Sequence, residues 1–127
     1  MKTSYYAKYS RLPKEEKDKY IPIAISTTIP KWFTECEYHL CELSPSSESV
    51  FKLKHGKMEI SEFTLEYIDK LRHWVKIDDI LDEAKEIESS EDKEIVFLCY
   101  EKSDDFCHRH LLRDFLNNNY DINIEEL

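Results

Sequence analysis

Two short apolar runs in the sequence predict two strands that are separated by helices. The first run, IPIAIS, covers residues 21–26, and the second, IVFLCY, covers residues 95–100. The second run is apolar at every position, which is typical of a strand that lies in the middle of a sheet with both faces buried. Covering both faces of such a strand requires helices, so the pattern predicts an α/β fold.

Helical spacing of apolar residues supplies three helices between the two strands. The first is predicted over residues 45–54, where Ser44 offers a capping hydroxyl and Gly56 ends the helix. Ser61 caps the second helix. The buried face of that second helix is predicted to consist of Phe63, Tyr67, Leu71 and Trp74 or Val75. The third helix has the buried stripe Ile77, Ile80, Leu81, Ala84 and Ile87.

One more helix and a final strand are predicted after residue 100. The helix covers residues 107–118, and its buried stripe consists of Leu111, Leu112, Phe115 and Leu116. Asparagines at 117–119 offer left-handed residues that would stop it. Tyr120, Ile122 and Ile124 alternate as an edge strand, which a short right-handed crossover would place beside the strand at 95–100. We therefore predict a small three-layer α/β domain with a mostly parallel sheet, formed by residues 1–127.

Composition and charge limit the functions that this fold could serve. The chain has 127 residues, of which 41% are hydrophobic and 35% charged, as expected of one globular domain. A net charge of -9 disfavours a broad surface for nucleic acid. Residues 1–20 carry a net charge of +3, and we interpret them as a basic, aromatic arm that closes over a ligand or simply packs on the domain. The absence of a secretory pattern and of a long apolar run predicts a cytoplasmic protein without a membrane partner.

Chemically versatile side chains gather where the second strand ends and the last helix begins. In an open parallel sheet, ligands bind at the carboxyl ends of the strands, beside the N-termini of the following helices. Cys107 and His108 lie at the N-terminal end of the buried face of the last helix, and Arg109 lies next to them at the edge of the expected site. A helix N-terminus favours an anion and a lowered thiol pKa, and arginine adds a bidentate donor. We therefore expect Cys107 to be a nucleophile, with Glu101 as the orienting carboxylate, His108 as the proton carrier and Arg109 as the anion clamp.

The same residues form two short motifs, Cys-Tyr-Glu at 99–101 and Cys-His-Arg at 107–109. On these motifs the chain resembles the domain-of-unknown-function 488 family, and IPIAISTTIPKWF and the Leu-Ser-Pro segment at 43–45 are similar to further features of that family. The resemblance implies a Rossmann-like domain with a pocket formed by the two motifs, and it implies no established reaction. Tyr100, Ser26 and Thr27 therefore join the candidate ligand-binding residues. Family members often carry a basic residue after the first strand, where this chain has Thr27 and Thr28.

Each candidate also has a plainer structural interpretation. Cys99, inside an apolar strand, is more simply an inert packed thiol, and Cys107 a capping or packing residue. His108 on a buried face is commonly a hydrogen-bonded structural histidine. Arg109 could pair with Glu101, Asp104 or Asp105. The combination nevertheless favours a functional pocket, because core packing does not require Cys, His, Arg and Glu together at a strand end.

A metal centre is the competing chemical interpretation of the cysteines and histidines. Cys36, His39 and Cys41 lie close together in the sequence. They could join Cys99, Cys107 or His108 in a tetrahedral zinc site. Because the sequence has no paired C-x-x-C, we assign no metal ligand, and the identity of any cofactor stays open.

Two functions of different class follow from these observations. The first is a pocket that binds or acts on an anionic small molecule, with a nucleotide as one candidate. The alternative is a regulatory or protein-interaction module with a structural Cys/His cluster, with or without zinc. A single glycine and the absence of G-x-S-x-G and H-E-x-x-H motifs exclude the usual signatures of ATPases, dehydrogenases, esterases and zinc proteases. Enzymatic activity, and the choice between monomer and dimer, stay open.

Overall fold

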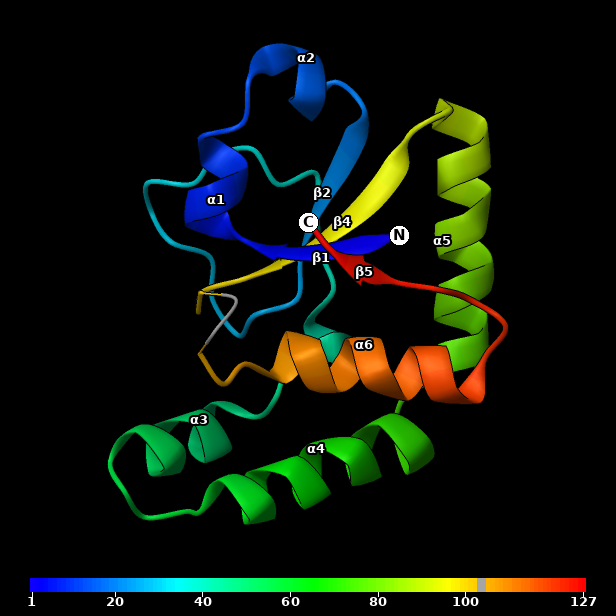
Figure 1. Cartoon of the computed structure of the whole chain (residues 1–127). Helices are drawn as coiled ribbons and strands as arrows, with labels where there is room; N and C mark the ends of the chain where they lie inside the picture. The colour runs from blue at the N-terminus through cyan, green and yellow to red at the C-terminus, as the bar shows by residue number, and fades with distance from the viewer. Residues whose placement is uncertain (103–104) are drawn as a thin grey trace.

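The computed structural model describes residues 1–102 and 105–127. In chain order its elements are β1 (Lys2–Tyr5), α1 (Tyr6–Ser10), α2 (Lys14–Lys17), β2 (Tyr20–Ala24), β3 (Tyr38–His39), a short 3-10 helix (Cys41–Leu43), α3 (Ser47–Lys54), α4 (Ile60–His73), α5 (Ile77–Glu91), β4 (Glu94–Cys99), α6 (His108–Asn119) and β5 (Glu125–Glu126). The strands form one parallel sheet in the order β3, β2, β4, β1, β5 (Figure 1). The predicted Rossmann-like α/β fold is confirmed, with β4 at the centre of the sheet.

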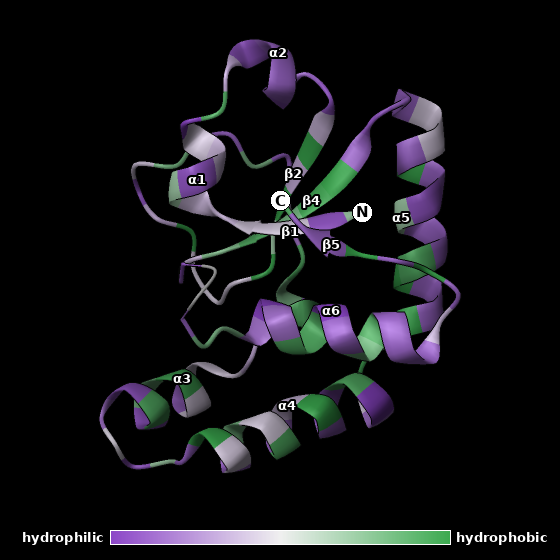
Figure 2. Cartoon of the chain, viewed as in Figure 1, coloured by the Kyte–Doolittle hydropathy of each residue, from purple (hydrophilic) through white to green (hydrophobic). Residues whose placement is uncertain are grey.

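Alternation along the strands divides the core into two side-chain layers. Ile23, Phe97 and their same-face neighbours pack against α4, α5 and α6. Ala24, Leu98 and the other side chains of the opposite face pack against Tyr6 of α1 and its apolar neighbours. Figure 2 shows most of β4 as hydrophobic and α2 as hydrophilic. Burial on both faces explains why β4 reads as an unbroken apolar run.

The N-terminus forms part of the sheet, although the sequence predicts a peripheral arm. Residues 2–5 are β1, which pairs with β4 on one side and β5 on the other. Tyr6 and Tyr9 are buried, so neither is positioned as a lid over a ligand. The strand escapes prediction because Thr3 and Ser4 are polar, and their burial follows from pairing with distant segments rather than from local pattern.

The C-terminal segment also differs from the prediction. β5 contains only Glu125–Glu126 and pairs with β1, so the last strand is not a neighbour of β4. Residues 120–124 are instead tied to α6, because the Asn117 amide accepts from the Ile124 N–H at 2.7 Å and donates to the Ile124 carbonyl at 2.9 Å. Tyr120 ends α6 in an extended conformation, so the expected left-handed asparagine stop is wrong.

The three middle helices form as predicted, with different first residues. Ser46 caps α3, and Glu59 and Glu62 form a capping box at the start of α4, so neither Ser44 nor Ser61 has the predicted capping role. Trp74 is 80% exposed and lies outside the buried face of α4. None of the helices in the described part of the chain has the length and apolar character that crossing a membrane requires.

We expect the layer between α6 and the sheet to carry much of the stability. Leu112 is fully buried there, whereas Leu65 on α4 is 73% exposed. Leu112→Ala should lower the free energy of unfolding by about 2–4 kcal/mol, because it leaves a cavity in a packed core. Leu65→Ala should change that free energy by less than about 0.5 kcal/mol. Urea denaturation measures both, and equal losses would contradict this placement of α6.

Candidate functional site

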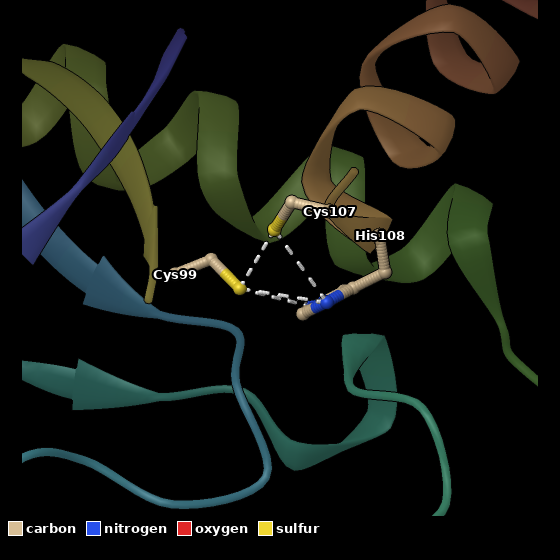
Figure 3. A group of neighbouring side chains, drawn as sticks. All are labelled: Cys99, Cys107 and His108. Carbon is tan, nitrogen blue, oxygen red and sulfur yellow. Dashed lines mark hydrogen bonds between the residues drawn. The ribbon is translucent and has the colours of Figure 1, made fainter. Parts of the chain in front are cut away.

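Cys99, Cys107 and His108, here named the Cys/His cluster, meet where β4 ends and α6 begins (Figure 3). The two sulfur atoms are 3.0 Å apart. His108 Nδ1 lies 3.5 Å from Cys99 Sγ and 4.0 Å from Cys107 Sγ. All three side chains are at most 6% exposed. The structure thus brings together Cys107 and His108, as predicted, and adds Cys99 to them.

Local geometry explains why these side chains converge. Cys99 lies on the same face of β4 as Ile95 and Phe97, which face the helix α6. Cys107 is the N-cap residue of α6 and has an extended backbone, with φ -148° and ψ 141°. Its thiol contacts Cys99 instead of capping the helix. The alternation of side chains along the strand was the sequence signal that could have placed Cys99 on the face toward the helix. Because every residue of the run is apolar, the sequence did not show which face each side chain takes.

His108 is held in one orientation by contacts on either side of its ring. Its Nε2 lies 2.7 Å from the carbonyl oxygen of Ile25. Because a carbonyl only accepts, Nε2 carries a proton and Nδ1 faces the two sulfurs. The Tyr67 ring packs edge-on against the imidazole with centroids 5.4 Å apart, and the Tyr67 hydroxyl donates to the Leu43 carbonyl at 2.5 Å. Sequence reasoning gave Tyr67 only a core role and missed this positioning contact.

The two cysteines have opposite electrostatic tendencies. The hydrogen bond with Cys99 lowers the pKa of Cys107 well below its usual value, and His108 and Arg109 reinforce the effect against the opposing effect of burial. The same hydrogen bond and burial raise the pKa of Cys99. Burial, followed by the nearby Cys107 thiolate, raises the pKa of Glu101, whose Oε2 lies 3.7 Å from Cys99 Sγ. The cluster therefore favours one thiolate, on Cys107, beside a Cys99 thiol that retains its proton.

Arg109 faces away from the cluster. Its side chain is completely buried, and its guanidinium donates to the Glu126 carboxylate at 2.9 Å and to the Glu101 carbonyl at 2.5 Å. Arg109 does not lie on the rim of the site, where it was expected. It follows His108 by one residue, and the rotation of the helix between successive residues turns its side chain toward β1 and β5. Ion pairing was anticipated, but the partner is Glu126; Asp104 lies outside the described residues.

A cavity of about 900 Å³ opens above the cluster at the carboxyl end of the sheet. Cys99, Cys107 and His108 line it together with Glu101 and Tyr100. On the side of α3 and α4 its lining is mainly apolar and includes Val50, Leu53, Met58, Ile60 and Phe63, together with the charged residues Lys54 and Glu59. The site thus combines a polar end at the two motifs with an apolar wall, as binding pockets for small molecules commonly do.

Hydroxyl groups after β2 complete the cavity lining. Ser26 Oγ lies 2.5 Å from the Tyr6 hydroxyl and donates to the Thr28 carbonyl at 2.6 Å. Thr27 Oγ1 donates to the Pro45 carbonyl at 3.1 Å. Ser26 and Thr27 therefore line the predicted site, and their hydrogen bonds also stabilise the loop that follows β2. Thr28 Oγ1 lies 3.2 Å from the Tyr100 hydroxyl, and this pair is exposed.

The residues of the wider zinc hypothesis do not come together. Among the described residues, the group that could hold a metal ion is Cys99, Cys107 and His108, whose ligand atoms lie within 4.8 Å of one another. His39 Nε2 contacts the Ser26 carbonyl at 2.7 Å, and Cys41 is exposed. Cys36 packs on the opposite face of the sheet, where burial raises its pKa to about 11.

Comparison with known proteins gives one finding. Residues 7–120 match the family model DUF488-N3a, described as the active DUF488-N3 subclade. The matched range includes the motifs at 99–101 and 107–109, and it leaves β1 and β5 outside. No curated protein and no solved structure matches the chain.

We expect the ion pair of Arg109 with Glu126 to stabilise the start of α6. Glu126→Gln should lower the free energy of unfolding by about 2–3 kcal/mol, because it removes the countercharge of a buried guanidinium. The neighbouring Glu125 is exposed and contacts Lys2 at 3.8 Å, so Glu125→Gln is the matched control, with an effect below about 0.5 kcal/mol. Chemical denaturation measures both variants, and an equal, small effect would show that Arg109 does not depend on this carboxylate.

Proposed function

The chain belongs to the DUF488 family, in its N3 subclade, and from that membership and the site geometry we propose a cysteine-dependent enzyme that acts on an anionic, electrophilic small molecule. The observation that carries the proposal is the position of Cys107 Sγ, 3.0 Å from Cys99 Sγ, at the inner end of a cavity of about 900 Å³. A thiolate, not a thiol, is the nucleophilic form of cysteine. The family description calls the subclade active without naming a reaction.

Each group of the site has a role in this proposal. The Cys107 thiolate forms a bond to an electrophilic carbon of the ligand, and the bond from that carbon to its leaving group breaks. Glu101, whose pKa is raised by burial, is suited to protonate the leaving group. Nδ1 of His108 then accepts a proton from the water whose oxygen bonds to that carbon, the carbon–sulfur bond breaks to restore the Cys107 thiolate, and the proton returns to Glu101. Cys99 donates a hydrogen bond to Cys107 Sγ whenever that sulfur carries negative charge.

The cavity lining supports the ligand class. Lys54 is a cation of the lining and supports a negatively charged group on the ligand, a role that sequence analysis gave to Arg109. Side chains such as Leu53 and Met58 would contact an apolar or planar part, and the exposed hydroxyls of Thr28 and Tyr100 offer polar contacts at the rim. A nucleotide fits this combination of a planar part and an anionic part, and the cavity volume suits a ligand of that size.

One observation favours a second candidate, a metal-dependent site. Nε2 of His108 donates its proton to a backbone carbonyl, which leaves Nδ1 facing the sulfurs. Metal-binding histidines are usually oriented in this way, by a hydrogen bond from the nitrogen that does not bind the metal. Two cysteines and one histidine, with the cavity as the open fourth position, form a donor set known from catalytic zinc. The sulfurs are closer than such a site requires, because two thiolates on tetrahedral zinc lie roughly 3.8 Å apart. A structural zinc module would need a fourth protein ligand in addition to these three.

Site-resolved alkylation of the reduced protein across pH tests the nucleophile. We expect the rate at Cys107 to be nearly constant between about pH 6 and 9, because its thiol is already ionised. The rate at Cys36 should rise about tenfold per pH unit, since burial raises the pKa of that thiol to about 11. Cys99→Ala should slow alkylation of Cys107 at pH 6 by about tenfold or more, whereas Cys99→Ser retains a hydrogen-bond donor and should slow it less.

Metal analysis of the same preparation separates the two candidates. If Cys107 becomes reactive only after a chelator has removed a stoichiometric metal, the metal-dependent site replaces the free nucleophile. A Cys107 that stays unreactive both with and without chelator, while the protein is folded, would contradict both candidates and leave the cluster a structural element.

A further inference from the structure

Cys99 and Cys107 are arranged as a pair of thiols that a small movement would join. Their sulfurs are 3.0 Å apart, and a disulfide requires about 2.05 Å, so an approach of roughly 1 Å suffices. Both cysteines are free; Cys99 is the last residue of β4, and Cys107 is the N-cap residue that precedes α6. Both also line the cavity, which gives a small solute a route to sulfurs that are otherwise buried.

We propose that a hydroperoxide oxidises this pair to a reversible Cys99–Cys107 disulfide. The Cys107 thiolate attacks one oxygen of the hydroperoxide, the O–O bond breaks, and the departing alkoxide or hydroxide takes a proton from Glu101 or solvent. Cys107 is then a sulfenic acid. The thiol of Cys99 attacks its sulfur, the S–O bond breaks, and the hydroxyl group and the Cys99 proton leave as water. The peroxide gains two electrons, and the two sulfurs lose them.

The surroundings of the pair suit each of the two steps. Cys107 is the N-cap residue of α6, and the helix N-terminus favours a thiolate there, so it is the sulfur that reacts first with the oxidant. Cys99 Sγ lies 3.0 Å from Cys107 Sγ, close enough to attack a sulfenic acid formed on Cys107. A disulfide at this position would remove the thiolate that catalysis requires. This inference therefore rests on the proposed function for its consequence, but not for its chemistry.

Treating the full-length reduced protein with stoichiometric hydrogen peroxide tests the inference. Trypsin cleaves after Lys93, Lys102 and Arg109, so Cys99 and Cys107 fall in separate peptides, residues 94–102 and 103–109. We expect mass spectrometry to find these two peptides joined by a disulfide, and dithiothreitol to release them. Cys36→Ser/Cys41→Ser, which lacks the other two thiols, should give the same joined peptides. In Cys99→Ser, treated with at least two equivalents of peroxide, Cys107 should instead advance to a sulfinic acid that dithiothreitol does not reverse.

Absence of the joined peptides from peroxide-treated wild type overturns the inference, whatever the state of the variants. Iodoacetamide labelling of the untreated protein is scored separately and reports on the proposed nucleophile. Rapid labelling of Cys107 without a disulfide would refute only the redox inference. Slow labelling together with a peroxide-dependent disulfide would refute only the proposed nucleophile.

Discussion

The contact between the sulfurs of Cys99 and Cys107 organises the site. At 3.0 Å, in surroundings where both side chains are almost fully buried, two thiolates would repel each other with little water to screen them. The pair can therefore hold at most one negative charge, and a hydrogen bond from the protonated sulfur would stabilise that charge on the other sulfur. Burial, together with Cys107, raises the pKa of Glu101 beside this pair, and the contact of His108 Nε2 with the Ile25 carbonyl turns Nδ1 toward the sulfurs.

This contact depends on parts of the chain that are far from it in sequence. α6 presents Cys107 to the end of β4, and Arg109 ties the first turn of α6 to Glu126 in β5. β5 in turn pairs with β1, which lies against β4. Both terminal strands thus hold the helix that begins beside Cys107, although both lie outside the range that matches the family. Arg109 pairs with Glu126 and is not among the described residues that line the cavity.

The sequence predicted those features that depend on local pattern. Apolar spacing predicted β4 and the amphipathic helices. The usual position of ligands at strand ends predicted a site with Cys107 and His108 where β4 ends and α6 begins. What it could not predict depends on long-range pairing. β1 is short and polar, so only its partners reveal it as an inner strand. The direction of Arg109 was missed for the same reason, because Glu126 comes beside it only through β5. Cys99 was given a packing role because burial alone does not show that a second sulfur lies beside it.

The ionisation of Cys107 in the reduced, metal-free protein is the property on which the proposed chemistry rests. Ultraviolet absorbance of the thiolate, followed across pH in wild type and in Cys107→Ser, measures it directly. We expect wild type to show one thiolate that forms below about pH 6 and is missing in the variant. If no thiolate forms in wild type until about pH 8.5, the range of an ordinary cysteine, then the contact with Cys99 does not activate Cys107 and the proposed nucleophile is wrong.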